Sequence, residues 1–107
     1  PERAVNFYSA AFGWKISKRE GDQPYWLFET GPDEEPGING GITLRAGSNT
    51  TVNTIGVSDL DDAINRVQDA GGKVISEKLE IPDVGIMAYC QDTEGNPFGI
   101  IQPEPAP

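Results

Sequence analysis

Apolar residues in the first half of the chain form one helical stripe followed by three denser runs. Ala4, Phe7, Tyr8 and Ala11 have the i, i+3, i+4, i+7 spacing of a single helix face. This spacing predicts a helix over residues 2–12, and Gly13 suits the position directly after its end. The runs that follow predict strands over residues 14–19, 25–30 and 39–46.

The second half shows the same order of elements, preceded by one further strand. Ser58 or Asp59 can cap a helix whose apolar stripe begins at Leu60, and Gly71-Gly72 can end it. The strands predicted here cover residues 52–57, 73–79, 84–91 and 97–102. Polar segments rich in Gly and Pro predict turns at 21–24 and 92–96 and a loop at 31–37.

A shift of 59 residues places part of the first half on identical residues of the second. The identities are Ala4, Asn6, Ala11, Gly13, Ile16 and Ser17 on Ala63, Asn65, Ala70, Gly72, Ile75 and Ser76. This indicates a duplicated unit, α-β-β-β in the first half and β-α-β-β-β in the second. We expect one α+β domain over residues 1–107, with unit one at 1–46, a linker at 47–50, unit two at 51–102 and a frayed tail at 103–107.

The first unit lacks a counterpart of the strand over residues 52–57. We expect this strand before Pro1 in the natural protein, in a segment of roughly eight to ten residues, the length of one strand and a turn. A partner chain could also supply it, and the alternative is a degenerate first copy that has lost it.

Composition narrows the classes of partner. Seventeen acidic and eight basic side chains give a formal charge of −9, which disfavours nucleic acid and anionic membranes as partners. Cys90 is the single cysteine, and the chain has neither a membrane-spanning apolar run nor a visible signal peptide. We therefore expect a cytoplasmic protein.

Three groups of motifs, in order, resemble those of the vicinal oxygen chelate superfamily, which includes glyoxalase I, bleomycin-resistance proteins and extradiol dioxygenases. They are residues 1–8 with Phe12-Gly13-Trp14, residues 59–63 with 70–74, and residues 92–100. Tyr25-Trp26 and residues 37–41 are similar to small glyoxalase-like proteins, many without an assigned activity. The resemblance implies curved mixed sheets around a cavity with helices outside, and a homodimer.

In metal-binding members of that superfamily, the first and last strands of each unit supply four ligands, usually His, Glu or Gln. The matching positions here are Thr54, Gly99 and Gly41, and the fourth lies in the strand expected before Pro1. Glycine offers no ligand, a Thr hydroxyl is a poor one for a transition metal, and the chain has no histidine. We expect no metal and no cofactor.

A cavity lined by aromatic rings would suit a planar or apolar small molecule. The candidate ligand-binding residues are Tyr25, Trp26, Phe28, Asn39, Gly41, Thr54, Tyr89 and Gly99. The two glycines are expected to leave room for a ligand, with sheet curvature as the alternative. Strand alternation sends neighbours to opposite faces, so some of the rings belong to the core, and Phe98 and Ile100 face the helices if Gly99 faces the cavity.

No catalytic residue is assigned. Glu29 is a weak candidate for a general base and Arg45 for an anion contact. The leading hypothesis is a metal-free binder of a small molecule. The alternatives are a metal-dependent lyase or dioxygenase of the same superfamily, and a structural dimerisation module without a ligand.

Overall fold

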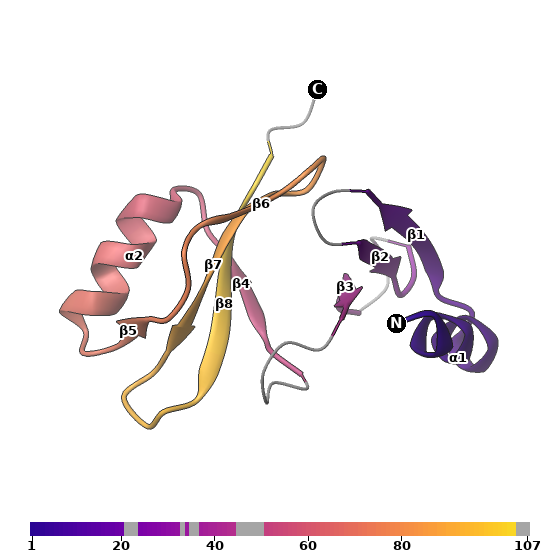
Figure 1. Cartoon of the computed structure of the whole chain (residues 1–107), viewed down its shortest axis with the longest axis horizontal. Helices are drawn as coiled ribbons and strands as arrows, with labels where there is room; N and C mark the ends of the chain where they lie inside the picture. Colours follow the sequence, from indigo (N-terminus) through magenta and orange to yellow (C-terminus); the bar gives the residue numbers. More distant parts are fainter. Residues whose placement is uncertain (21–23, 33, 35–36, 45–50, 105–107) are drawn as a thin grey trace. The chain divides into compact units, whose positions relative to one another are not determined.

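The computed structural model describes the chain except for residues 21–23, 33, 35–36, 45–50 and 105–107 (Figure 1). The chain divides into two compact units, Pro1–Ser48 and Asn49–Pro107. Two helices and two sheets confirm the α+β class. Neither described helix is long and apolar enough to span a membrane.

In the first unit one helix packs on a three-stranded antiparallel sheet. Its elements are α1 (Glu2–Phe12), β1 (Lys15–Arg19), β2 (Tyr25–Glu29) and β3 (Gly40–Thr43), and the strand order is β1-β2-β3. Gly13 ends α1 with φ 69°, a left-handed conformation that glycine adopts without steric cost. The ring of Trp14 then stacks between Tyr8 of α1 and Phe28 of β2, at centroid distances of 4.7 and 4.6 Å.

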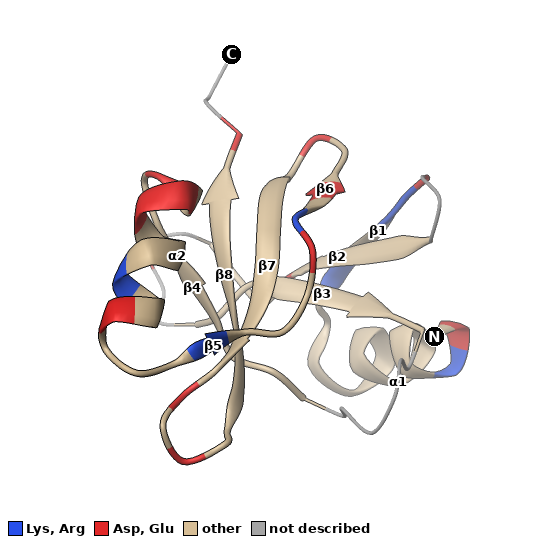
Figure 2. Ribbon diagram, turned by 60° about the vertical axis from the view of Figure 1, so that its left-hand side comes forward, with Lys and Arg blue, Asp and Glu red and all other residues tan. Residues whose placement is uncertain are grey.

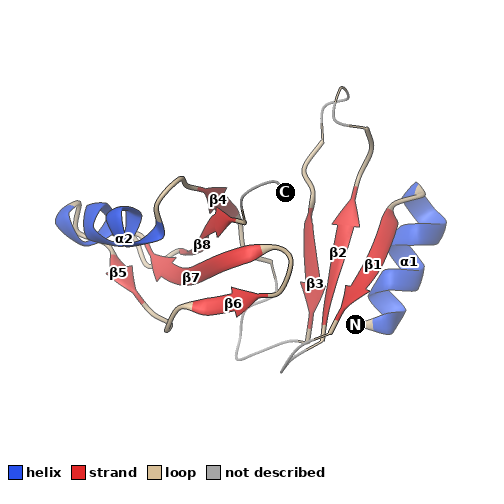
Figure 3. Ribbon diagram, turned by 90° about the horizontal axis from the view of Figure 1, so that it is seen from above, coloured by secondary structure: helices blue, strands red, loops and turns tan. Residues whose placement is uncertain are grey.

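In the second unit the helix covers one face of a mixed sheet, as Figure 3 shows. Its elements are β4 (Thr54–Gly56), α2 (Leu60–Asp69), β5 (Lys73–Val74), β6 (Leu79–Ile81), β7 (Gly85–Gln91) and β8 (Pro97–Pro103). The strand order is β4-β8-β7-β5, with β6 also pairing with β7, and β4 runs parallel to β8. Leu60 of α2 packs with Ala88, Cys90 and Ile100 in the buried core, and Phe98 lies against this cluster, which agrees with the predicted alternation.

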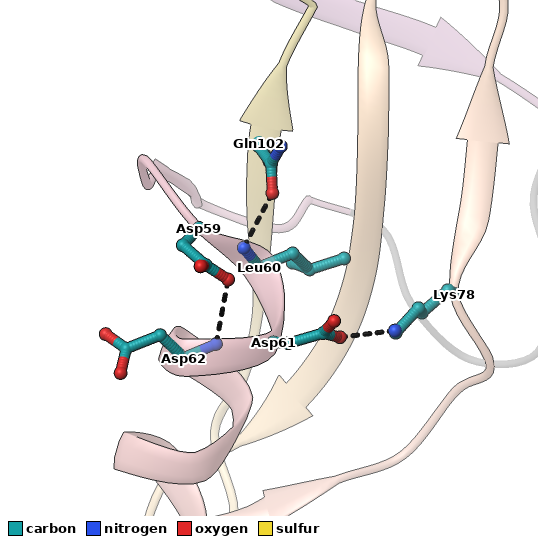
Figure 4. Close-up of polar contacts among 6 residues, drawn as sticks. All are labelled: Asp59, Leu60, Asp61, Asp62, Lys78 and Gln102. Carbon is teal, nitrogen blue, oxygen red and sulfur yellow. Dashed lines mark hydrogen bonds and ion pairs between the residues drawn. The ribbon is translucent and has the colours of Figure 1, made fainter.

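The start of α2 is held by polar contacts (Figure 4). The Asp59 carboxylate accepts the backbone N–H of Asp62 at 3.1 Å, as expected of an N-cap. Gln102 of β8 accepts the N–H of Leu60 at 2.8 Å, and Lys78 forms an ion pair with Asp61. These contacts fix the helix against the sheet at its first turn.

Three expectations need correction. The strand predicted over residues 73–79 is two strands, because the Ser76 hydroxyl accepts the N–H of Tyr89 at 2.8 Å and takes the place of a backbone partner. Pro103 belongs to β8, and the N–H of Glu104 donates to Val84 at 2.9 Å, so the tail begins later than residue 103. The described sheet of the first unit is antiparallel throughout, whereas only the second is mixed.

Some predicted features cannot be compared with the structure. The linker at 47–50 and Arg45 lie outside the described residues, as do most of the turn at 21–24 and parts of the loop at 31–37. The two units, Pro1–Ser48 and Asn49–Pro107, are each compact. Their union in one domain over residues 1–107 stays a prediction.

Candidate functional site

Three of the candidate residues lie side by side on the face of the second sheet that α2 does not cover. Thr54 of β4 pairs with Gly99 of β8, and Gly99 pairs with Tyr89 of β7. The next residue along each strand points to the opposite face, which α2 covers. These residues are Ile55, Ile100 and Cys90. The row Thr54–Gly99–Tyr89 therefore lies on what we call the open face of the second unit.

Gly99 shapes this row by lacking a side chain. A Cβ atom at Gly99 would lie 3.0 Å from the Thr54 Oγ1 atom and 3.2 Å from the Met87 Cε atom. The sequence predicts free space above Gly99, and the structure instead places two side chains close around it. Met87 is nearly fully buried, whereas Thr54 is exposed at the sheet edge. Thr54 can rotate away from Gly99 more easily than Met87 can.

Hydrogen bonds hold the Tyr89 end of the row. The Ser76 hydroxyl accepts the N–H of Tyr89 and donates to the carbonyl of Glu77, each at 2.8 Å. The N–H of Ile75 donates to the Tyr89 carbonyl at 2.8 Å. Both backbone polar groups of Tyr89 are thus bonded to the segment Ile75-Ser76, which positions its half-buried ring.

In the first unit the candidate residues fall on both faces of the sheet. The register pairs Arg19 with Tyr25 and Tyr25 with Thr43, and it pairs Leu27 with Gly41. These residues share the face that α1 does not cover, which we call the open face of the first unit. A Cβ at Gly41 would collide with the ring of Tyr25, so this ring lies over Gly41 and fills the space that the sequence predicts to be free.

Trp26 and Phe28 lie on the opposite face from Tyr25, together with Ile16. Phe28 is engaged in the stack with Trp14, and the Lys18 Nζ atom lies 5.4 Å from the centre of the Trp26 ring. Asn39 precedes β3, and its side-chain oxygen accepts the N–H of Thr30 at 3.0 Å. These contacts favour structural roles for Phe28 and Asn39, and they leave Tyr25 and Gly41 as the candidates on the open face.

The side chains at these positions do not fit a metal. Thr54 offers only a hydroxyl, and Gly99 and Gly41 have no side chain that could bind a metal. The row Thr54–Gly99–Tyr89 contains neither an imidazole nor a carboxylate. The described residues contain no group of three or more His, Cys, Asp or Glu side chains placed to hold an ion. The donor set therefore disagrees with the metal site that the superfamily resemblance implies.

A groove that the sequence reasoning missed lies on the helix-covered side of the second unit. It has a volume of about 570 Å³ and runs between α2 and the strands β4 and β8. Its apolar lining includes Ile55, Val67 and Phe98, and Ile55 is 54% exposed. Most of these side chains also form or flank the core, so we interpret the groove as core surface that α2 leaves uncovered at the sheet edge. The alternation of Thr54 and Ile55 on an edge strand is the sequence signal that points to it.

The described ionisable groups with a shifted pKa, Cys90 and Asp92, form no reactive centre on the open faces. Burial raises the pKa of the Cys90 thiol, so Cys90 is protonated and behaves as a small apolar core residue. Hydrogen bonds from Asn96, and then from Glu94, lower the pKa of Asp92 in the β7–β8 turn. Glu29 is exposed and pairs in register with Lys15, at the far end of β2 from Tyr25.

Comparison with known proteins identifies the family. Residues 1–101 match the family of the glyoxalase-like domain. The chain belongs to this family. Its glyoxalase-like domain is 32% identical over 107 residues to "Putative glyoxylase CFP32" of Mycobacterium bovis and of Mycobacterium tuberculosis, with 98% of this chain covered. It is also 32% identical to a glyoxylase-like domain-containing protein of Didymella fabae, covering 92% of this chain and 82% of that protein.

The glyoxalase-like domain spans 41% of the length of the mycobacterial relatives. Among solved structures, TioX from Micromonospora sp. ML1 is similar with a TM-score of 0.43 and 20% identity, over 97% of this chain and 90% of that one. TnmS3, an antibiotic-binding protein from Streptomyces sp. CB03234, has a TM-score of 0.43 and 23% identity, over 96% and 86% of the two chains.

Proposed function

We propose that this glyoxalase-like domain is a metal-independent binder of a planar or apolar small molecule, and that the open face of each unit, taken by itself, is a surface on which such a ligand binds. The observation that carries the proposal is the row Thr54–Gly99–Tyr89. Two of its residues, Thr54 and Gly99, hold positions where the superfamily resemblance implies metal ligands. The row offers a hydroxyl at Thr54, a bare backbone at Gly99 and an aromatic ring at Tyr89.

Two features of the open faces support binding over chemistry. Tyr89 and Tyr25 each present a ring whose backbone is held in a strand, and such rings give large contact area at a small entropy cost. The side chains that close over Gly99 and Gly41 are Thr54, Met87 and Tyr25, and a ligand can displace the exposed Thr54. Among the described residues of these faces, no pair is placed to act as nucleophile and base.

Further parts of the proposal concern assembly and location. We propose a homodimer, because large apolar side chains of α1 are exposed, with Phe7 at 58% and Phe12 at 63%. We propose a cytoplasmic location, which suits a single buried, reduced cysteine. We also propose that the two units form one domain.

Thr54 and Ile55 provide a matched pair of variants for the test. The two residues are adjacent on the edge strand β4, both exposed, and point to opposite faces. A panel of planar and apolar compounds is first screened by thermal shift on the chelator-treated 107-residue chain. The affinity of each hit is then measured by calorimetry for wild type, Thr54→Lys and Ile55→Lys. A lysine on an edge strand is well tolerated, so both variants should fold.

We expect Thr54→Lys to weaken binding about tenfold or more, because the longer side chain enters the ligand's space, and Ile55→Lys to leave the affinity unchanged. The reverse pattern would place the ligand in the groove beside α2 and contradict the proposed face. Binding or turnover that requires an added divalent metal would favour a metal-dependent lyase or dioxygenase. An absence of hits together with a stable dimer would favour the structural module.

A further inference from the structure

Arg19 lies at one end of β1, a strand with basic residues at both ends (Figure 2), and it shares the open face of the first unit with Tyr25. The two residues are register partners on β1 and β2, and the row continues to Thr43 of β3. The Arg19 Nη1 atom donates to the Ser17 hydroxyl at 3.1 Å, in a solvent-exposed contact between two residues on the same face of β1. The open face thus brings together the hydroxyl of Ser17, the guanidinium of Arg19 and the ring of Tyr25, which lies over Gly41.

The guanidinium of Arg19 is incompletely paired. Its Nε atom is buried without a hydrogen-bond partner, the one such side-chain atom among the described residues that are not exposed. A buried donor of a charged group that lacks an acceptor is unfavourable and uncommon in native proteins. Within the described part of the chain Arg19 also has no acidic partner. Because the Nε atom is closed off, an acceptor from outside the chain would meet the terminal Nη atoms, of which Nη1 lies in an exposed contact with Ser17.

The duplicated unit provides an internal comparison. The same shift of 59 residues that relates the two halves places Arg19 on Lys78 and Glu2 on Asp61. Lys78 and Asp61 form an ion pair that neutralises the lysine, whereas Glu2 and Arg19 form none. In the second unit Lys78 pairs with Asp61 of α2. In the first unit the equivalent Arg19 lies on the open face. The two copies therefore differ in how the cation at this position is paired.

We propose that Arg19 recognises an acidic group, a carboxylate, on a planar small molecule whose ring system lies against Tyr25. This inference rests on the proposed function and narrows its ligand class. The planar fork of arginine matches the two oxygens of a carboxylate, and bonds between charged partners are about twice as strong as neutral ones. Ser17, whose hydroxyl accepts a hydrogen bond from the guanidinium, would keep the guanidinium oriented toward the carboxylate during binding.

The charges around Arg19 are compatible with this assignment. Lys15 and Glu29 face each other at the other end of the sheet, and Lys18 and Glu20 pair with each other. The formal charge of −9 disfavours anions at long range, but at physiological salt the Debye length is about 8 Å. A local cation therefore decides whether a carboxylate is accepted.

The test uses two probes of equal shape, 2-naphthoate and the uncharged 2-naphthamide, and compares their affinities for the 107-residue chain by calorimetry. We expect wild type to prefer the naphthoate by about tenfold or more. Arg19→Gln should remove this preference and leave the naphthamide affinity unchanged, which also shows that the variant is folded. Arg19→Lys should keep part of the preference. Lys18→Gln is the matched control, because Lys18 is adjacent on β1 but lies on the opposite face, over Trp26.

Each outcome decides between the two proposals. If both probes bind with equal affinity, or the preference survives in Arg19→Gln, the domain is still a binder and the assignment of Arg19 is wrong. If Lys18→Gln removes the preference as well, the effect is one of overall charge and the assignment is again wrong. If neither probe binds and the wider panel gives no hits, the inference fails together with the proposed function.

Discussion

The first unit packs its helix with aromatic rings, whereas the second packs its helix with aliphatic side chains. In the first, Trp14 lies between Tyr8 and Phe28, and none of the described residues is buried. In the second, Leu60, Ala88, Cys90 and Ile100 form a buried cluster that α2 and the sheet share. The second sheet has the parallel edge strand β4, and the described sheet of the first has three strands.

This difference shows how two copies of one unit can depend on different interactions. A stack of half-exposed rings gains from ring–ring contact but keeps part of its surface in water. A buried aliphatic cluster gains from complete removal of its surface from water, at about 25 cal/mol per Å² of apolar area. We therefore expect the second unit to be the more sensitive to truncated side chains.

The largest expected effect is in the second unit. Ile100→Ala removes a side chain that is 2% exposed at the centre of the core. We expect the free energy of unfolding to fall by about 3 kcal/mol, from lost burial and the cavity left behind. Denaturant unfolding followed by circular dichroism measures it. Ile38→Ala is the control, because Ile38 is 84% exposed, and a comparable loss there would refute the assignment of the core.

A smaller effect is expected from the aromatic stack. Trp14→Leu keeps an apolar side chain but removes two stacked pairs, with centroid distances of 4.7 and 4.6 Å. We expect a loss of about 2 kcal/mol, since each aromatic pair contributes about 0.5–1.5 kcal/mol beyond its burial. Trp14→Phe should restore roughly half of this loss in the same unfolding measurement. Equal losses for the leucine and phenylalanine variants would mean that stacking is not what holds α1.

The smallest effect concerns the two strand glycines Gly41 and Gly56. A methyl group at Gly41 would meet the Tyr25 ring, whereas one at Gly56 would meet nothing within 4 Å. We expect Gly41→Ala to cost about 1 kcal/mol, because the ring must swing aside, and Gly56→Ala to be neutral or slightly stabilising. If the two variants have the same stability, Tyr25 does not rest on Gly41.

Much of the fold follows from local patterns in the sequence. The stripe from Ala4 to Ala11 and the glycine after it fix α1 and its left-handed end, because both depend on residues close together in the chain. Alternation also predicted that Phe98 and Ile100 face the helix. In both units the helix comes before its antiparallel strands, as the repeat predicts, although the second unit has one strand more there because β5 and β6 are separate.

The rest depends on contacts between residues far apart in the chain. Alternation separates Tyr25 from Trp26, but only the stack of Phe28 on Trp14 decides which of the two faces α1. The ring over Gly41 and the hydroxyl of Ser76 in place of a strand partner follow from register and side-chain packing. The sequence did not predict Arg19 as a site residue, because the burial and missing partner of its Nε atom depend on the three-dimensional structure.

The most direct test of the central claim is an NMR titration of the chelator-treated, isotope-labelled chain with 2-naphthoate. We predict saturable shifts of the backbone amides of Thr54, Tyr89 and Gly99 and of Tyr25 and Gly41, in the absence of any added metal. Shifts confined to Ile55, Val67 and Phe98 around the groove, or shifts on the open faces that require an added divalent metal, would contradict the claim.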